Sequence, residues 1–84
     1  MVAKYDAEFR DWLINCQYLQ RRSAGDLISR RKKLKSLIVN HETLSMKEIE
    51  SILQIQAANG EFTRSTMRSM LRSETLFREY SNKV

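Results

Sequence analysis

Basic residues concentrate in one short segment of this chain, which indicates an anionic partner, and a surface that contacts phosphate is one role for such a segment. Between Arg21 and Lys35 the sequence holds seven basic residues and one acid, Asp26. Residues 21–35 therefore carry a net charge of +6, whereas the whole chain carries +5. Each cation that neutralises a phosphate releases counterions, which makes binding steeply salt-dependent. The residues that we expect to contact phosphate are Arg30, Arg31, Lys32, Lys33 and Lys35.

Three further roles for this basic segment stay open. Arg21 and Arg22 precede the main block at a spacing compatible with a bipartite nuclear localisation signal. A helix lying on a membrane surface would need a wider apolar face than this segment offers. A merely solvated helix face usually intersperses acids among its cations, because five cations in six residues repel one another. The pattern favours a functional surface.

A second group of cations recurs every four residues near the carboxyl end. Arg64, Arg68 and Arg72 form one stripe on a helix, beside Ser65. Residues 45–53 and 63–71 resemble the two helices of a helix-turn-helix, although the first helix and the connection are longer than in the compact motif. The resemblance implies that Arg64, Ser65 and Arg68 reach base edges or phosphates in the major groove, and that Arg72 meets phosphate. The start of the second helix also favours a phosphate.

These patterns predict a small non-enzymatic DNA-binding protein, a regulator of transcription or replication. A homodimer is a secondary expectation, since many such readers are two-fold symmetric. One alternative is a protein-interaction module, an adaptor or inhibitor that docks on an acidic protein surface. Small basic helical proteins can use their charge to steer such docking equally well. Taken alone, the helix-turn-helix pattern fits an ordinary antiparallel helical hairpin with solvated arginines better than a DNA reader, and the basic charge elsewhere favours DNA. RNA is less favoured, because no aromatic side chains accompany the cations.

Catalysis has little support in the sequence. His41 is the single histidine and Cys16 the single cysteine, and a Cys–His pair would also need a third group to orient the histidine. We expect Cys16 to be a small core residue and His41 a solvated loop residue. The spacing of residues predicts no metal site, cofactor or phosphate-binding glycine loop. No apolar run is long enough to span a bilayer and no secretory signal is evident, so we expect an intracellular protein, cytoplasmic or, in a eukaryote, nuclear.

The elements that must position these residues are predicted to be helices. The chain of 84 residues has no proline and two glycines, which favours one all-α domain, a compact bundle of about four helices. The expected helices span residues 5–22, with a stop near Gly25, then 26–39, from Ser45 to about residue 59, and 63–80. The residues expected to face inward are Tyr5, Phe9, Trp12, Leu13, Cys16, Leu19, Leu27, Arg31, Leu34, Ile38, Ile49, Ile52, Leu53, Met67, Met70, Leu71 and Phe77.

The helix ends carry the clearest local signals. Ser45 and Glu48 have the spacing of a capping box, in which each side chain accepts a hydrogen bond from the other residue's backbone amide. Leu44 and Ile49 have the positions of the hydrophobic staple that accompanies such a box. Asn59 and Gly60 tolerate left-handed backbone and predict the end of the third helix. Thr63 is the expected N-cap of the fourth helix.

Overall fold

Helices account for nearly all of the regular structure in the computed structural model, which describes residues 4–83 and the side chains of residues 7–82. The expectation of an all-α bundle is confirmed. The elements are the α-helices α1 (Lys4–Cys16), α2 (Arg21–Leu37), α3 (Met46–Ala58) and α4 (Arg64–Lys83), with a short 3-10 helix, η1 (His41–Thr43), between α2 and α3. No helix within residues 4–83 combines the length and the apolar character needed to cross a membrane.

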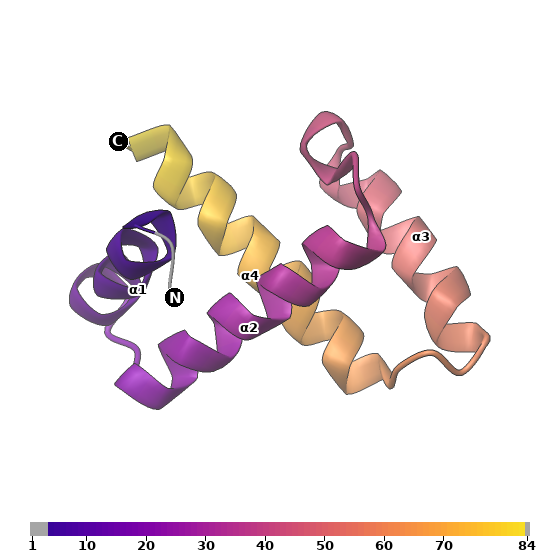
Figure 1. Cartoon of the computed structure of the whole chain (residues 1–84), viewed down its shortest axis with the longest axis horizontal. Helices are drawn as coiled ribbons and strands as arrows, with labels where there is room; N and C mark the ends of the chain where they lie inside the picture. Colours follow the sequence, from indigo (N-terminus) through magenta and orange to yellow (C-terminus); the bar gives the residue numbers. More distant parts are fainter. Residues whose placement is uncertain (1–3, 84) are drawn as a thin grey trace.

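The two long helices, α2 and α4, cross near the middle of the molecule and make its most extensive contact (Figure 1). Helix α1 lies on one side of this crossing, where it contacts α2 and, less extensively, α4. Helix α3 lies on the other side and packs mainly on α4. Every helix therefore buries its apolar face against α2, α4 or both.

The core forms two clusters, and α2 and α4 contribute to each. The first cluster contains Phe9, Leu13, Ala24, Leu27, Ile28 and Tyr80. The second contains Leu34, Ile38, Ile49, Leu53, Met67 and Met70. The inward positions predicted for α3 and α4 lie in or against the second cluster, except Phe77, which packs against the first. Tyr5 is also expected to face inward, but its side chain lies outside the described residues.

An ion network joins the two clusters at the helix crossing. Glu74 is 2% exposed, and its Oε1 accepts a hydrogen bond from Arg31 Nε at 3.2 Å. Arg78 Nε lies 3.4 Å from the other carboxylate oxygen of Glu74. The same Arg78 donates to the backbone oxygens of His41 and Leu44, at 3.1 and 2.8 Å. The network thus connects α2 and α4 to the segment that leads into α3.

The predicted signals at the ends of α3 and α4 are confirmed. Ser45 Oγ accepts from Glu48 N at 3.2 Å, and Glu48 Oε1 accepts from Ser45 N at 3.1 Å, which completes the capping box. Gly60 follows α3 with φ +83°, a left-handed conformation that suits glycine. Thr63 Oγ1 then accepts from Thr66 N at 3.2 Å and caps α4.

The predicted boundary between the first two helices is wrong. Helix α1 ends at Cys16, and α2 already begins at Arg21, so Arg21 and Arg22 start α2 and do not end α1. The chain turns at Tyr18, whose φ is +57°, and Leu19 N donates across the turn to Leu13 O at 3.1 Å. Gly25, the expected stop, lies inside α2.

Cys16 and His41 also differ from expectation. Cys16 is exposed, because α1 ends at this residue and no other element covers it. His41 is 3% exposed, since η1 folds it inward and its Nδ1 lies 3.3 Å from the oxygen of Ile38. Helix α1 and the η1 segment lie on opposite sides of the molecule in Figure 1, so these two residues form no catalytic pair.

Candidate nucleic-acid interface

The start of α4 is open to solvent. Thr63, Arg64 and Ser65 are exposed, and so are Arg68 and Arg72 further along the helix. The Thr63 side chain occupies the amide of Thr66, while the first amides of a helix have no acceptor within the helix itself. This end therefore presents free N–H groups, a positive dipole end and exposed arginines on one surface.

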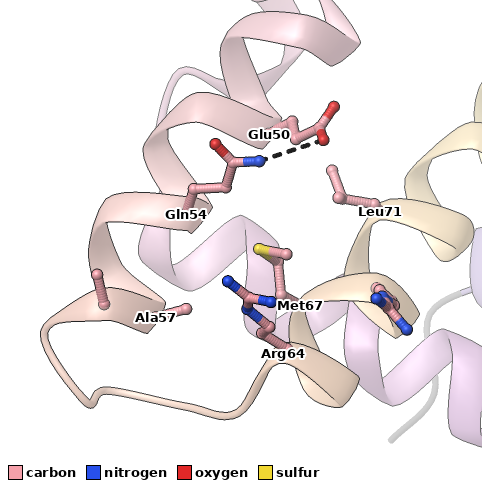
Figure 2. A pocket seen from close by; sticks show the side chains of 8 residues that line it. Glu50, Gln54, Ala57, Arg64, Met67 and Leu71 are labelled. Carbon is pink, nitrogen blue, oxygen red and sulfur yellow. Dashed lines mark hydrogen bonds between the residues drawn. The ribbon is translucent and has the colours of Figure 1, made fainter.

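Arg64 and Arg68 line a groove between α3 and α4 (Figure 2). The groove has a volume of about 540 Å³, and its apolar lining comes from Ala57, Ala58, Met67 and Leu71. Across from the arginines, α3 contributes Glu50 and Gln54, which are joined by a hydrogen bond from Gln54 Nε2 to Glu50 Oε1 at 3.4 Å. The groove thus has a basic side on α4 and an acidic, amide-bearing side on α3.

Arg72 lies beside α2 and not in that groove. It lines a second hollow, between α2 and α4, together with Arg30. The remaining residues around this α2–α4 hollow are Ser23, Asp26, Leu27 and Ser69. Two of the predicted cations, which are far apart in the sequence, are therefore brought to the same place by the helix crossing.

Arg31 does not lie on the exposed cationic surface. It is 7% exposed, is paired with Glu74 and has its guanidinium carbon 3.4 Å from the centre of the Phe77 ring. The predicted inward stripe of α2 already included Arg31 beside Leu27, and the structure confirms that position. The expected contact between Arg31 and phosphate is therefore wrong, because burial and the ion pair with Glu74 on α4 keep its charge away from the surface.

The rest of the basic block divides between two flanks of α2. Successive helical residues turn by about 100°, so Arg30 and Lys33 lie on one side of the buried stripe and Lys32 and Lys35 on the other. Lys33 Nζ lies 5.8 Å from the Phe62 ring centre, next to the connection between α3 and α4. Arg30 therefore lies beside Ser69 and Arg72 of α4, and Lys33 lies beside the connection that leads into α4. Lys32 and Lys35 lie on the other flank.

The arginines of this surface have no acidic partner among the described side chains. Arg31 and Arg78 are both paired with Glu74, but none of Arg30, Arg64, Arg68 and Arg72 forms an ion pair or side-chain hydrogen bond within residues 7–82. Uncompensated guanidinium groups in water are available for an external anion. The candidate interface, as defined by the structure, consists of Arg30, Lys33, Arg64, Ser65, Arg68 and Arg72.

Sequence reasoning missed several residues at this surface. Ser69 follows Ser65 by four residues, so these two serines form a row beside the arginine stripe. This spacing could have identified Ser69 from the sequence. Ser23 and Gln54 offered no comparable signal, because their positions depend on how α2 and α3 meet α4. Within residues 7–82, no group of three or more His, Cys, Asp or Glu side chains is placed to hold a metal ion.

Comparisons with protein-family models, with curated proteins and with solved structures found no match for this chain.

Proposed function

We propose that this protein binds double-stranded DNA, with α4 as the helix that enters the major groove. The observation that carries the proposal is the exposed, capped start of α4, where Arg64, Ser65 and Arg68 project without acidic partners. A helix in the major groove contacts bases through its first turns, and Arg is the commonest reader of guanine. Regulation of transcription or replication is the role that such a reader would serve.

The cations on α2 supply the backbone contacts in this proposal. Arg30 meets Arg72 beside α4, and Lys33 lies on the same flank of α2. Contacts to phosphate fix the position of a protein on the duplex, whereas contacts to bases provide the sequence preference. We assign Arg64, Ser65 and Arg68 to the bases or nearby phosphates, and Arg30, Lys33 and Arg72 to phosphates.

A salt series with mixed duplex DNA tests this function. We expect the wild-type protein to bind at low salt, with a slope of log K against log salt of about −0.9 for each phosphate contacted. The variant Arg64→Ala/Arg68→Ala should bind more weakly and discriminate less among sequences, because base contacts set specificity. The control Lys35→Ala/Lys47→Ala loses the same charge from exposed positions outside the interface and should keep the sequence preference. Absence of wild-type binding at low salt would contradict the proposal.

An acidic protein surface is the second candidate partner. The groove between α3 and α4 favours it, because apolar side chains of Met67 and Leu71 lie there beside the free charges of Arg64 and Arg68. Such a combination suits a partner with acidic and aliphatic side chains. Capture of a protein from nuclease-treated extract, lost in the Arg64→Ala/Arg68→Ala variant, would support this candidate if duplex DNA does not bind.

A further inference from the structure

We propose that the α2–α4 hollow is a seat for one phosphate of the DNA backbone, held jointly by Arg30 and Arg72. The proposal rests on the proposed DNA binding and adds a defined site to it. The hollow has a volume of about 320 Å³ and is lined by residues from both crossing helices. One liquid water takes about 30 Å³, so the hollow has room for a phosphate group together with bridging waters.

The two arginines have the chemistry that a phosphate seat needs. A guanidinium presents five N–H donors in a planar fork that matches two phosphate oxygens at once. Arg31 and Arg78, on the same two helices, already donate to Glu74, whereas Arg30 and Arg72 have no such partner within residues 7–82. These four arginines on α2 and α4 therefore form two pairs: Arg31 and Arg78 bind the buried carboxylate of Glu74, whereas Arg30 and Arg72 have no anion.

The two serines have different parts in this site. Ser69 donates its hydroxyl proton to the backbone oxygen of Ser65, at 3.1 Å, so this proton is not available to an anion. The short side chain of Ser69 contributes only space to the site. Ser23 is exposed at the edge of the hollow and forms no side-chain hydrogen bond to another described residue. Its hydroxyl is the additional neutral donor available to a phosphate oxygen.

Asp26 gives the hollow a built-in opposing charge. It lies one helical turn before Arg30 and lines the same hollow, but it forms no ion pair with Arg30 or Arg72. Two guanidinium groups and one carboxylate leave the hollow with a positive charge, and the carboxylate weakens its attraction for an anion. Removal of the Asp26 charge should therefore tighten binding, an effect opposite in sign to loss of either arginine.

The position of the hollow fits the proposed reading helix. Arg72 follows Arg64 by eight residues, about 12 Å along α4 at a rise of 1.5 Å per residue. The major groove is about 12 Å wide, so a phosphate on one edge of the groove can be held at Arg72 while Arg64 extends into the groove. The seat would fix how far α4 enters, and Arg30 would hold the same phosphate from the neighbouring helix.

Fluorescence anisotropy with one mixed duplex DNA, measured over a salt series, tests the seat. We expect Arg30→Ala and Arg72→Ala each to weaken binding by roughly tenfold, the equivalent of one charge-assisted hydrogen bond. Because both arginines hold the same phosphate, the double variant should reduce the salt slope by about 0.9, the value for one phosphate and not two. Asp26→Asn should bind several times more tightly than the wild type, a gain that misfolding cannot produce.

Lys35→Ala is the matched control for charge, because Lys35 is exposed on the opposite flank of α2. If Arg30→Ala and Arg72→Ala change affinity no more than this control, the seat is wrong while DNA binding stands. A double variant whose salt slope falls by the value for two phosphates would also overturn the seat alone. An Asp26→Asn variant that binds DNA no more tightly than the wild type would do the same. Failure of the wild type to bind DNA at low salt would overturn both proposals.

Discussion

The carboxylate of Glu74 pairs with the guanidinium groups of Arg31 and Arg78, and this pairing holds Arg31 away from the exposed cationic surface. Its side chain is 3% exposed, and that of Arg31 is 9% exposed, so neither charge has much contact with water. A buried ion pair contributes little net stability compared with apolar residues of the same shape. Loss of one partner is much worse, because the remaining charge stays buried without compensation.

Glu74→Ala should therefore destabilise the protein by about 3–5 kcal/mol, the range for breaking a buried pair. The physical reason is that Arg31 would stay beneath α4 with its charge unpaired. Urea unfolding followed by circular dichroism measures the change. Glu79→Ala is the control, since Glu79 is an exposed acid on the same helix and its loss should change stability by less than about 0.5 kcal/mol.

The same pair offers a second check on this interpretation. Arg31→Met/Glu74→Leu replaces both charges with apolar side chains and should recover most of the stability that Glu74→Ala loses. A Glu74→Ala variant as stable as Glu79→Ala would show that the pair does not compensate a buried charge.

Arg31 also explains one limit of sequence reasoning at the scale of single residues. Helical periodicity places it on the inward stripe with Leu27 and Leu34, while its charge places it in the exposed basic block. The two patterns conflict, and the deciding partner, Glu74, lies 43 positions away. No local signal connects the two residues, so only the crossing of α2 and α4 reveals which pattern holds.

At the scale of elements, the two glycines have opposite roles. Gly25 lies within α2, and a Cβ built there has no neighbouring atom within 4 Å. Gly60 follows α3 with φ +83°, where a side chain is strained even though the space is open. The sequence predicts that both glycines end helices, and this holds for Gly60 alone.

Gly25→Ala should stabilise the protein by about 0.5–1 kcal/mol, because alanine is the better helix former and narrows the unfolded ensemble. Gly60→Ala should destabilise it by about 1–2 kcal/mol, the cost of left-handed backbone for a residue with a Cβ. Thermal unfolding of the two variants under identical conditions measures both effects. A shift of the melting temperature in the same direction for both would contradict the assigned backbone conformations.

Helix ends were predictable where a side chain caps the backbone within a few residues. Ser45 with Glu48, and Thr63 with Thr66, satisfy amides within three positions, so their signals are local. The end of α1 has no such signal. It depends on Tyr18, a non-glycine residue in left-handed backbone, and on Leu19, which packs against the first core cluster. Tertiary packing thus overrides the apolar periodicity that predicts a longer first helix.

At the scale of the whole molecule, the crossing of α2 and α4 assembles the candidate interface. The sequence identified the cations on both helices, but periodicity within one helix cannot give the angle at which two helices cross. That angle brings Arg30 to Arg72 and leaves Lys32 and Lys35 on the opposite flank of α2. The kinds of residue at the interface could therefore be predicted from the sequence, but which of the cations share one surface could not.

The same crossing should make the two core clusters unfold together. Helices α2 and α4 contribute residues to both clusters, and the Arg31–Glu74–Arg78 network lies between them. A domain this small has a stability of only about 5–15 kcal/mol. We therefore expect that neither cluster stays folded after the other has unfolded, because both depend on α2 and α4. A substitution that destabilises the first cluster should therefore also destabilise α3, which packs in the second cluster.

Leu13→Ala tests this coupling. Leu13 is fully buried in the first cluster, and its truncation should cost about 2–5 kcal/mol. We expect native-state hydrogen exchange to give the same loss for the slowest amides of α3 as for those of α4, because both would exchange through global unfolding. Leu53→Ala in the second cluster is the reciprocal variant and should affect α1 and α4 equally. If Leu13→Ala accelerates exchange in α1 alone, the first helix opens independently, and the shared helices do not couple the two halves of the core.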